Sequence, residues 1–574
     1  MRDDAADDKG VNEVSDRNTG SSAGSTPRSR ARPLVVPLLA SLVMLATACG
    51  NGDEPAASGA DETTDPGDPQ YGGSATYGLE AETSGGWCLP EAQLAISGLQ
   101  VAKSIYDTLT APNADGEFVP FLAESIEPNG DFTQWTITLP EGVVFHDGSP
   151  LTPQVVKNNL DAFTGAYPTR TPLLTRFVLE PIESVEVVDD STVQVTTSIP
   201  WPALPAALYS GGQAGVMAQA QLDDTETCDR NLIGTGPFML EEWVPNDQLT
   251  AVRNPDYWRS DEDGNQLPFL DRVVFRPIVD ASARSNAVAA GDVDLAHSAA
   301  ATVGELWEAD AESGTIALVR SEECPEVRYS LLNTSKPPFD NRDARLAAAH
   351  AIDRDRFNEV RYNGSVEMAS GPFGPGSIGH LDDTGYPDFD LEQSARHAAA
   401  YEEATGEQLS FTYVYGADSE NSQDVQLLQS MWDEADIDVQ VQGVEQAALI
   451  STVIGGDFDA VLWRRHGGCE PDTNYVQWQT DSRLNLARIR DPEISALLDT
   501  GRTSGDPQER RAAYQQINER FGSEAYGLWQ EWVTWNVATG PEVRGVLGPR
   551  MPDGSEPSEE LSGGHPLSGV WISS

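Results

Sequence analysis

Hydrophobic residues in the first half of the chain alternate with polar residues in short runs, which is typical of β-strands. Trp135, Ile137 and Leu139 alternate with threonines and predict one strand. A hairpin is predicted farther on by a second alternating set, Val185, Val187, Asp189, Asp190, Val193 and Val195. Between these segments the apolar positions change to helical spacing. The helix is predicted to begin at Thr152, to end at Gly165 and to bury Val156, Leu160 and Phe163.

The second half of the chain has a strand, a helix and a strand in succession. The apolar run at 409–415 predicts the first strand, and helical spacing then relates Val425, Leu428, Trp432 and Ala435. The second strand is predicted by Ile437, Val439 and Val441. Such a unit predicts a parallel pair with a right-handed crossover. Ligands of open α/β sheets lie at the carboxyl ends of the strands.

The length of the chain predicts more than one lobe. About 500 of its 574 residues follow the N-terminal segments described below, and one core stops growing well before that size. Two α/β lobes that face each other would form a cleft, and we expect a ligand to bind there.

The N-terminus has the features of a lipoprotein signal peptide. Arg28, Arg30 and Arg32 precede an apolar run at 33–48 that is too short to span a bilayer, and small residues lead to Cys49. We therefore predict a signal peptide with an N-terminal extension at 1–48, cleavage before Cys49 and a lipid on its sulfur. Ordinary secretion and an uncleaved anchor are the alternatives. Residues 49–70 are rich in Gly, Pro and acids and predict a disordered tether of roughly 70 Å maximal reach.

The charge of the chain excludes several classes of partner. The formal net charge is −55 at pH 7, and because acids and bases balance within 1–48, all of it lies on the mature part. Such a surface repels phosphate backbones and anionic head groups. We expect no nucleic-acid partner and no membrane contact other than the lipid on Cys49.

Four sequence motifs, in order, resemble one bacterial family. They are LPEGVVFHDGSPLT at 139–152, GTGPFMLEEWVPNDQLTAVRNPDYW at 234–258, AGDVDL at 290–295, and LNTSKPPFD at 332–340 followed by AIDR at 351–354. The segment 234–258 itself is a predicted hairpin, which is scaffold rather than binding site. Together the motifs resemble solute-binding protein family 5, the extracellular dipeptide- and oligopeptide-binding proteins of ABC importers.

The resemblance implies a fold, a function and partners. The fold is α/β, two-lobed and periplasmic-binding-protein-like, of the cluster C type, with a hinge and an interlobe ligand cleft. Its large first lobe is discontinuous and consists of 71–278 and 530–574, with the second lobe at 279–529 between them. The chain crosses from one lobe to the other near 276–280 and 529–537. The implied protein is a monomeric, lipid-anchored receptor on the outer face of the membrane. It delivers a peptide or similar small polar solute to an ABC permease with a cytoplasmic ATPase, and needs no cofactor.

Four of the five cysteines follow Cys49, and they allow three pairings. The lobe division implied by the resemblance favours Cys88 with Cys228 and Cys324 with Cys469, because the other pairings would lock the hinge. Free buried thiols are the alternative. A metal site is not expected, because the cysteines are scattered and lack the spacing of zinc ligands.

Motifs of common enzyme classes are missing from the sequence. It contains no His-Glu-x-x-His, no Walker loop and no dinucleotide fingerprint, and Gly-x-Ser-x-Gly occurs only at 20–24, inside the leader. We therefore expect a binding protein rather than a catalyst. Two other hypotheses are a binder of a non-peptide solute, such as an oligosaccharide or a metal chelate, and a secreted lipoprotein hydrolase.

A basic loop at 463–475 is the best candidate for ligand contact, because it breaks the acidic background after a predicted strand. Family members place an aspartate there for the amino group of a peptide, and the resemblance puts Arg465 or His466 at that position. It also puts Tyr415 where relatives have a carboxylate-binding arginine. Arginine offers a rigid fork of donors for anions. The full set of candidates is Trp87, Tyr415, Trp463, Arg464, Arg465 and His466. Salt bridges from the arginines to Glu470 and Asp472, and core packing of Trp87, are the alternatives.

Overall fold

The computed structural model describes residues 68–573 except for 84, 466–467 and 562–563. The predicted signal peptide, Cys49, tether residues 49–67 and His466 lie outside the described residues. Within the described part, no helix combines the length and the apolar character needed to cross a membrane.

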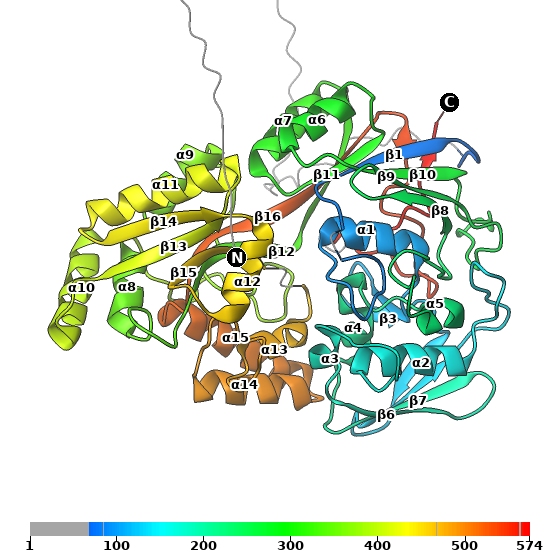
Figure 1. The fold of residues 1–574 in the computed structure, drawn as a ribbon, viewed down its shortest axis with the longest axis horizontal. Coiled ribbons are helices and arrows are strands. Elements are labelled where there is room, and N and C mark those ends of the chain that lie inside the picture. Colours follow the sequence, from blue (N-terminus) through cyan, green and yellow to red (C-terminus); the bar gives the residue numbers. More distant parts are fainter. Residues whose placement is uncertain (1–67, 84, 466–467, 562–563, 574) are drawn as a thin grey trace, which may run out of the picture. The chain divides into compact units, whose positions relative to one another are not determined.

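A sheet of ten strands is the centre of the fold (Figure 1). Its order is β14 (Asp438–Val444), β13 (Ser410–Gly416), β15 (Ala460–Arg465), β12 (Ala317–Leu332), β16 (Gly527–Thr539), β11 (Leu295–Ser298), β1 (Ser74–Leu79), β10 (Arg272–Pro277), β9 (Gln248–Arg253) and β8 (Phe238–Val244). β13 is parallel to β14 and β15, and β1 is parallel to β10 and β11. The sheet therefore contains two parallel groups with antiparallel strands between them.

The long strands β12 and β16 connect these two groups. Residues 317–321 of β12 pair with 535–539 of β16 beside β11, whereas residues 326–331 pair with 527–533 of β16 beside β15. The register shifts between Ser321 and Glu326, so the pairing is interrupted where the two parts meet. Figure 1 shows both strands running between the helices α8 to α11 on the left and α1 to α5 on the right.

Two large hydrophobic cores lie on the two sides of this junction. We call first core the cluster that includes residues of β1, β5, β7 and β10, and second core the cluster that includes residues of β13, α8, α11 and α15. β16 contributes Trp535 and Val537 to the first core and Trp529 and Trp532 to the second. A smaller cluster joins α6, α7 and β11, and β11 pairs with β1. The observed fold is the mixed α/β fold that the sequence predicts.

The remaining elements cover the sheet or form small sheets of their own. The helices are α1 (Ile96–Ile105), α2 (Pro153–Thr164), α3 (Thr175–Val178), α4 (Leu204–Tyr209), α5 (Gln219–Asp223), α6 (Ala281–Ala289), α7 (Ala301–Glu312), α8 (Arg342–His350), α9 (Arg354–Tyr362), α10 (Leu391–Thr405), α11 (Ser419–Glu434), α12 (Gln446–Gly455), α13 (Tyr475–Trp478), α14 (Pro492–Thr503) and α15 (Pro507–Ser523). Short 3-10 turns lie at Ser210–Gly212 and Pro471–Asn474. The smaller sheets contain β4 (Ser125–Pro128), β5 (Gln134–Thr138), β7 (Thr192–Thr197) and β6 (Ile182–Val187); β2 (Thr110–Pro112) and β3 (Phe118–Pro120); and β17 (Val543–Arg544) and β18 (Trp571–Ile572).

Several local predictions are confirmed, with visible causes. The Thr152 hydroxyl accepts a hydrogen bond from the amide of Val155 and begins α2, and Gly165 ends that helix at φ 89°, where glycine is favoured. β6 and β7 form the predicted hairpin. β13, α11 and β14 form the predicted unit, and the side chain of Asp418 caps α11.

Two disulfides are present in the structure. They join Cys88 to Cys228 and Cys324 to Cys469, with S–S distances of 2.06 and 1.96 Å. These are the pairings that the lobe division favours. Cys88 and Cys228 belong to the first core, whereas Cys324 lies in the interrupted part of β12 and Cys469 follows β15.

Candidate functional site

A cavity of about 100 Å³ lies beside β12 and β16, the strands that connect the two groups of parallel strands. Residues of α7, β12, α9, α11, β15 and β16 line it. Three neighbouring strands, β11, β13 and β15, direct their carboxyl ends toward this cavity. The helices α7 and α11 follow β11 and β13 and contribute residues to the lining, and Arg464 of the lining lies at the end of β15. This is the part of an open α/β sheet at which ligands bind.

The cavity is lined by charged side chains of both signs. The arginines are Arg320, Arg328 and Arg464, and the acids are Glu305, Glu308, Glu420 and Glu531. Arg320 forms an ion pair with Glu308. Among the described residues, no group of three or more His, Cys, Asp or Glu side chains is placed to hold a metal ion. The lining is therefore polar and carries charges of both signs.

The most deeply buried part of this lining surrounds Arg328. Its guanidinium lies 2.6 Å from Asp424, 3.6 Å from Glu531 and 3.8 Å from Glu420. Tyr362 donates a hydrogen bond of 3.1 Å to Oε1 of Glu531. Burial raises the pKa of Glu531 to about 7, although Arg328 opposes this shift. Burial also raises the pKa of Glu420. Arg328 thus lies among three acids, and Arg361 is a second cationic partner of Asp424.

Arg464 lies between this lining and a residue of the first core, Trp535. Its Nε lies 3.0 Å from Oε2 of Glu326, and its guanidinium lies 5.3 Å from the ring centre of Trp535. Burial opposes ionisation of Glu80, but the charge of Arg464, followed by those of His297 and Arg284, lowers the pKa of Glu80. Arg464 therefore acts electrostatically on a side chain that follows β1.

Comparison with known proteins identifies the family. The model of the bacterial extracellular solute-binding proteins, family 5, matches residues 117–485. The chain belongs to this family. Its members are substrate-binding proteins of ABC importers and not enzymes, so this chain is a binding protein.

Relatives of this family 5 protein carry different solutes. The glutathione-binding protein GsiB of Pectobacterium atrosepticum is 25% identical over 450 residues, which are 74% of this chain and 82% of that protein. DppA from Helicobacter pylori, solved with the peptide STSA, has a TM-score of 0.76 at 21% identity and covers 88% of this chain and 99% of its own. NikA from Brucella suis, solved with Fe(III)-EDTA, has a TM-score of 0.70 at 22% identity, and the match covers 87% of this chain and 100% of NikA. The periplasmic-binding-protein fold is thereby confirmed.

The two arginines of the basic loop differ in burial, since Arg464 is exposed and Arg465 is buried. Of the predicted binding residues that the structure describes, Arg464 alone lines the cavity. Arg465 is 5% exposed, its guanidinium lies 3.9 Å from the ring centre of Trp478, and its Nε donates to Gln477 at 2.6 Å. Burial lowers its pKa to about 10. Adjacent residues of a strand point to opposite faces, which separates the two arginines.

Glu470 and Asp472 do not pair with Arg464 or Arg465, and each of them pairs with a different arginine. Glu470 pairs with Arg510 at 2.6 Å and Asp472 with Arg502 at 2.8 Å, whereas Arg464 pairs with Glu326. Trp463 and Tyr415 are half-buried and pack against the second core. A binding role for them and for Arg465 stays a prediction.

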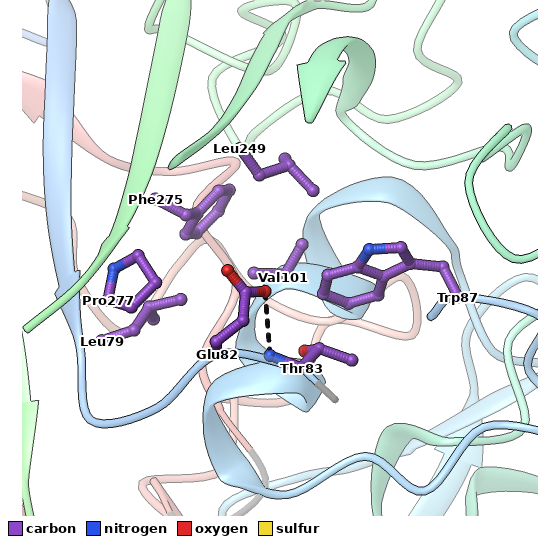
Figure 2. Close-up of a pocket in the computed structure, with 8 residues that line it drawn as sticks. All are labelled: Leu79, Glu82, Thr83, Trp87, Val101, Leu249, Phe275 and Pro277. Carbon is purple, nitrogen blue, oxygen red and sulfur yellow. Dashed lines mark hydrogen bonds between the residues drawn. The ribbon is translucent and has the colours of Figure 1, made fainter. Parts of the chain in front are cut away.

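Trp87 packs in the first core of the family 5 protein. It is 1% exposed and lies 5.8 Å from the ring of Trp243 in an edge-to-face contact. Figure 2 shows its ring pointing toward Glu82 and Val101 beside a small cavity of about 10 Å³, which has room for a single water at most. A solute at Trp87 would need the first core to open locally.

Sequence reasoning missed Arg320, Arg328, Glu531 and Asn536 of the lining. All four lie within β12 and β16, the two strands that cross between the cores. For Arg328 and Glu531 a signal was present, because charged residues interrupt mostly apolar stretches at 326–332 and 528–533. A charge in an apolar strand needs a buried partner or a ligand.

Proposed function

We propose that this protein binds a peptide or similar small polar solute in the cavity around Arg464 and delivers it to an ABC permease. The observation that carries the proposal is the composition of the cavity, in which arginines and acids from both sides of the β12–β16 junction face one space. A zwitterionic solute complements such a lining, because its two charges can pair with opposite walls. The glutathione- and peptide-binding relatives support this choice.

Binding in this proposal is coupled to movement at β12 and β16. A cavity of about 100 Å³ is smaller than the ~300–1,000 Å³ of typical small-molecule sites, so the solute enters while the halves of the protein are farther apart. The interrupted pairing between Ser321 and Glu326 is where we place the hinge. This placement assigns α6, β11 and α7 to the first lobe, a later boundary than the sequence predicts. Contacts with both lobes then favour closure.

The N-terminal features complete the proposal. Cys49 carries the lipid anchor, and residues 49–70 tether the monomeric receptor to the extracytoplasmic face of the membrane. The partner is a permease with a cytoplasmic ATPase, which recognises the closed form.

Two measurements test the proposal. Mass spectrometry of the solute released from gently purified protein is expected to give a small peptide or another zwitterion in about one equivalent, and a purely apolar solute would contradict the cavity assignment. Cys49→Ala is expected to move the protein from the membrane to the soluble fraction without changing its affinity for that solute. Retention of the variant in salt-washed membranes would contradict the lipid anchor.

A metal chelate is the second candidate solute. The NikA relative was solved with Fe(III)-EDTA, and such chelates also present several carboxylates to arginines. The same mass spectrum separates the two classes, because a chelate brings stoichiometric metal.

A further inference from the structure

Two histidines on the neighbouring helices α8 and α10 lie side by side. His350 is the last residue of α8, and His397 belongs to α10 (Figure 1). Their ring centres are 5.8 Å apart, and the two ring planes differ by 5°. Both side chains are half-buried, so solvent reaches them. Neither helix contributes to the lining of the cavity, and the pair is therefore separate from the candidate solute site.

The packing of the two helices directs these side chains toward each other. The amide of Asp390, before the start of α10, donates to the carbonyl of His350 at 3.0 Å. The hydroxyl of Ser394 donates to the carbonyl of Ala347 at 2.8 Å, so α8 and α10 are antiparallel. Side chains of a helix tilt toward its own N-terminus. That direction leads from His397 toward His350 on α10, and from His350 toward His397 on α8.

Hydrogen bonds place the proton of each neutral ring on Nδ1. Nδ1 of His350 lies 2.7 Å from the carbonyl oxygen of Asp388, and because a carbonyl can only accept, this nitrogen is the donor. Nδ1 of His397 lies 2.7 Å from Oδ1 of Asp343, whose carboxylate likewise accepts. The lone pair of each neutral imidazole is then on Nε2. Neither Nε2 atom has a hydrogen-bond partner among the described residues.

The separation of the rings allows one metal ion to reach both Nε2 atoms. An ion bound ~2.1 Å from Nε2 lies roughly 3.2 Å from the ring centre, so two rings can share it at centre separations up to roughly 6.4 Å. The observed 5.8 Å is within this limit. An oxygen that accepts from Nδ1 is also what orients most metal-binding histidines. Among the described residues no third His, Cys, Asp or Glu ligand joins the pair, so water completes the coordination.

We propose that His350 and His397 bind one divalent transition-metal ion, which links α8 to α10 on the second core. Imidazole nitrogen suits Cu²⁺, Ni²⁺ and Zn²⁺, whereas Mg²⁺ and Ca²⁺ prefer oxygen ligands, and Cu²⁺ binds such sites most tightly. The formal net charge of −55 attracts cations to the protein. This site goes beyond the proposed function, because no residue of it belongs to the cavity.

The test adds chloride salts of Cu²⁺, Ni²⁺, Zn²⁺ and Mg²⁺ to untagged protein that has been treated with a chelator. Calorimetric titration is expected to show one equivalent of Cu²⁺, weaker binding of Ni²⁺ and Zn²⁺, and no binding of Mg²⁺. The electron paramagnetic resonance spectrum of the Cu²⁺ form should show two nitrogen ligands. The bound ion should also raise the midpoint of thermal unfolding, because the unfolded chain does not hold the two rings together.

Variants of the pair connect these signals to the two rings. His350→Gln and His397→Gln are each expected to lose the two-nitrogen spectrum and the stabilisation by metal, while their thermal unfolding without metal remains cooperative. Asp343→Asn keeps both ligands but no longer orients His397 through its carboxylate. It should therefore keep the two-nitrogen spectrum and bind Cu²⁺ about tenfold more weakly.

His380→Gln is the matched control. The His380 side chain is 28% exposed and lies 3.4 Å from Asp382, but its ring contacts no second histidine among the described residues. This variant is expected to keep the metal equivalent, the spectrum and the stabilisation. If both variants of the pair bind metal like the wild type, or if the wild type binds none of these ions, His350 and His397 form only a packing contact and the inference is overturned. Neither outcome affects the proposed solute function.

Discussion

Among the places where the described residues of the first and second halves of the fold meet, two differ in hydrogen bonding. The first is the cavity, where buried atoms of Arg320, Glu531 and Asn536 lack partners among the described residues. The second, which we call the clasp, consists of Trp201, Asp472 and Arg502. Trp201 Nε1 donates to Asp472 at 2.7 Å, and Arg502 Nε donates to the same carboxylate at 2.8 Å. All three side chains are buried.

The difference separates a contact that stabilises the protein from one that receives a solute. At the clasp, the guanidinium of Arg502 also lies 3.5 Å from the ring centre of Tyr475, so the protein itself satisfies the charge. At the cavity, polar atoms are held in place and left without partners, at a cost to the empty protein. Mutations at the clasp should therefore change stability, and mutations at the cavity should change binding.

The largest expected effect tests the clasp. Asp472→Ala leaves Arg502 buried without its carboxylate, which should lower the free energy of unfolding by about 3–5 kcal/mol. Trp201→Phe removes only one neutral donor and should lower it by about 1 kcal/mol. Denaturant unfolding of the solute-free protein measures both.

Asp481→Ala is the control for the clasp, because Asp481 is exposed and should change stability by less than about 0.5 kcal/mol. If Asp472→Ala unfolds like the control, the clasp does not hold the two halves together, and the contrast with the cavity is lost.

The two adjacent arginines of β15 sharpen the comparison. The Arg464 side chain is 42% exposed in this structure, and a solute bound in the closed cavity would cover it. Arg464→Ala should then lower solute affinity by about 2–5 kcal/mol, the scale for loss of one partner of a charge pair that binding buries. Arg465→Ala should change affinity by less than about 1 kcal/mol and instead lower stability, because Arg465 packs on Trp478. Calorimetric titration with the co-purified solute, together with denaturant unfolding, measures both quantities. The reverse pattern would return Arg465 to the binding site.

Much of the fold follows from local sequence patterns. The helix at Thr152, the hairpin at Val185 and the strand–helix–strand unit after residue 409 are each determined by caps, turns and apolar spacing within a short stretch. The pairing of β11 with β1 is not local. It joins residues more than 200 positions apart, and no pattern within β11 specifies its neighbour.

The site was harder to predict for the same reason. The loop at 463–475 was found because it is basic, but local charge cannot tell which arginine points into the cavity. That follows from the register of β15, which places Arg464 opposite Arg328 and Arg465 opposite Val327. Arg328 and Glu531 come from strands far apart in the sequence, and their proximity depends on the tertiary fold.

The last prediction concerns a change of stability with pH at the cavity. Burial raises the pKa of Glu531 from 4.5 to about 7. Between these values the folded protein keeps a proton that the unfolded chain has released, so the free energy of unfolding falls as pH rises through this window. The slope from one group is at most about 1.4 kcal/mol per pH unit. Other groups titrate too, so the quantity to measure is the difference between wild type and Glu531→Gln.

That difference should appear between about pH 4.5 and 7 and should be constant above and below, as measured by denaturant unfolding of the solute-free proteins. If wild type and Glu531→Gln show no such difference, Glu531 is satisfied within the protein, as Asp472 is at the clasp.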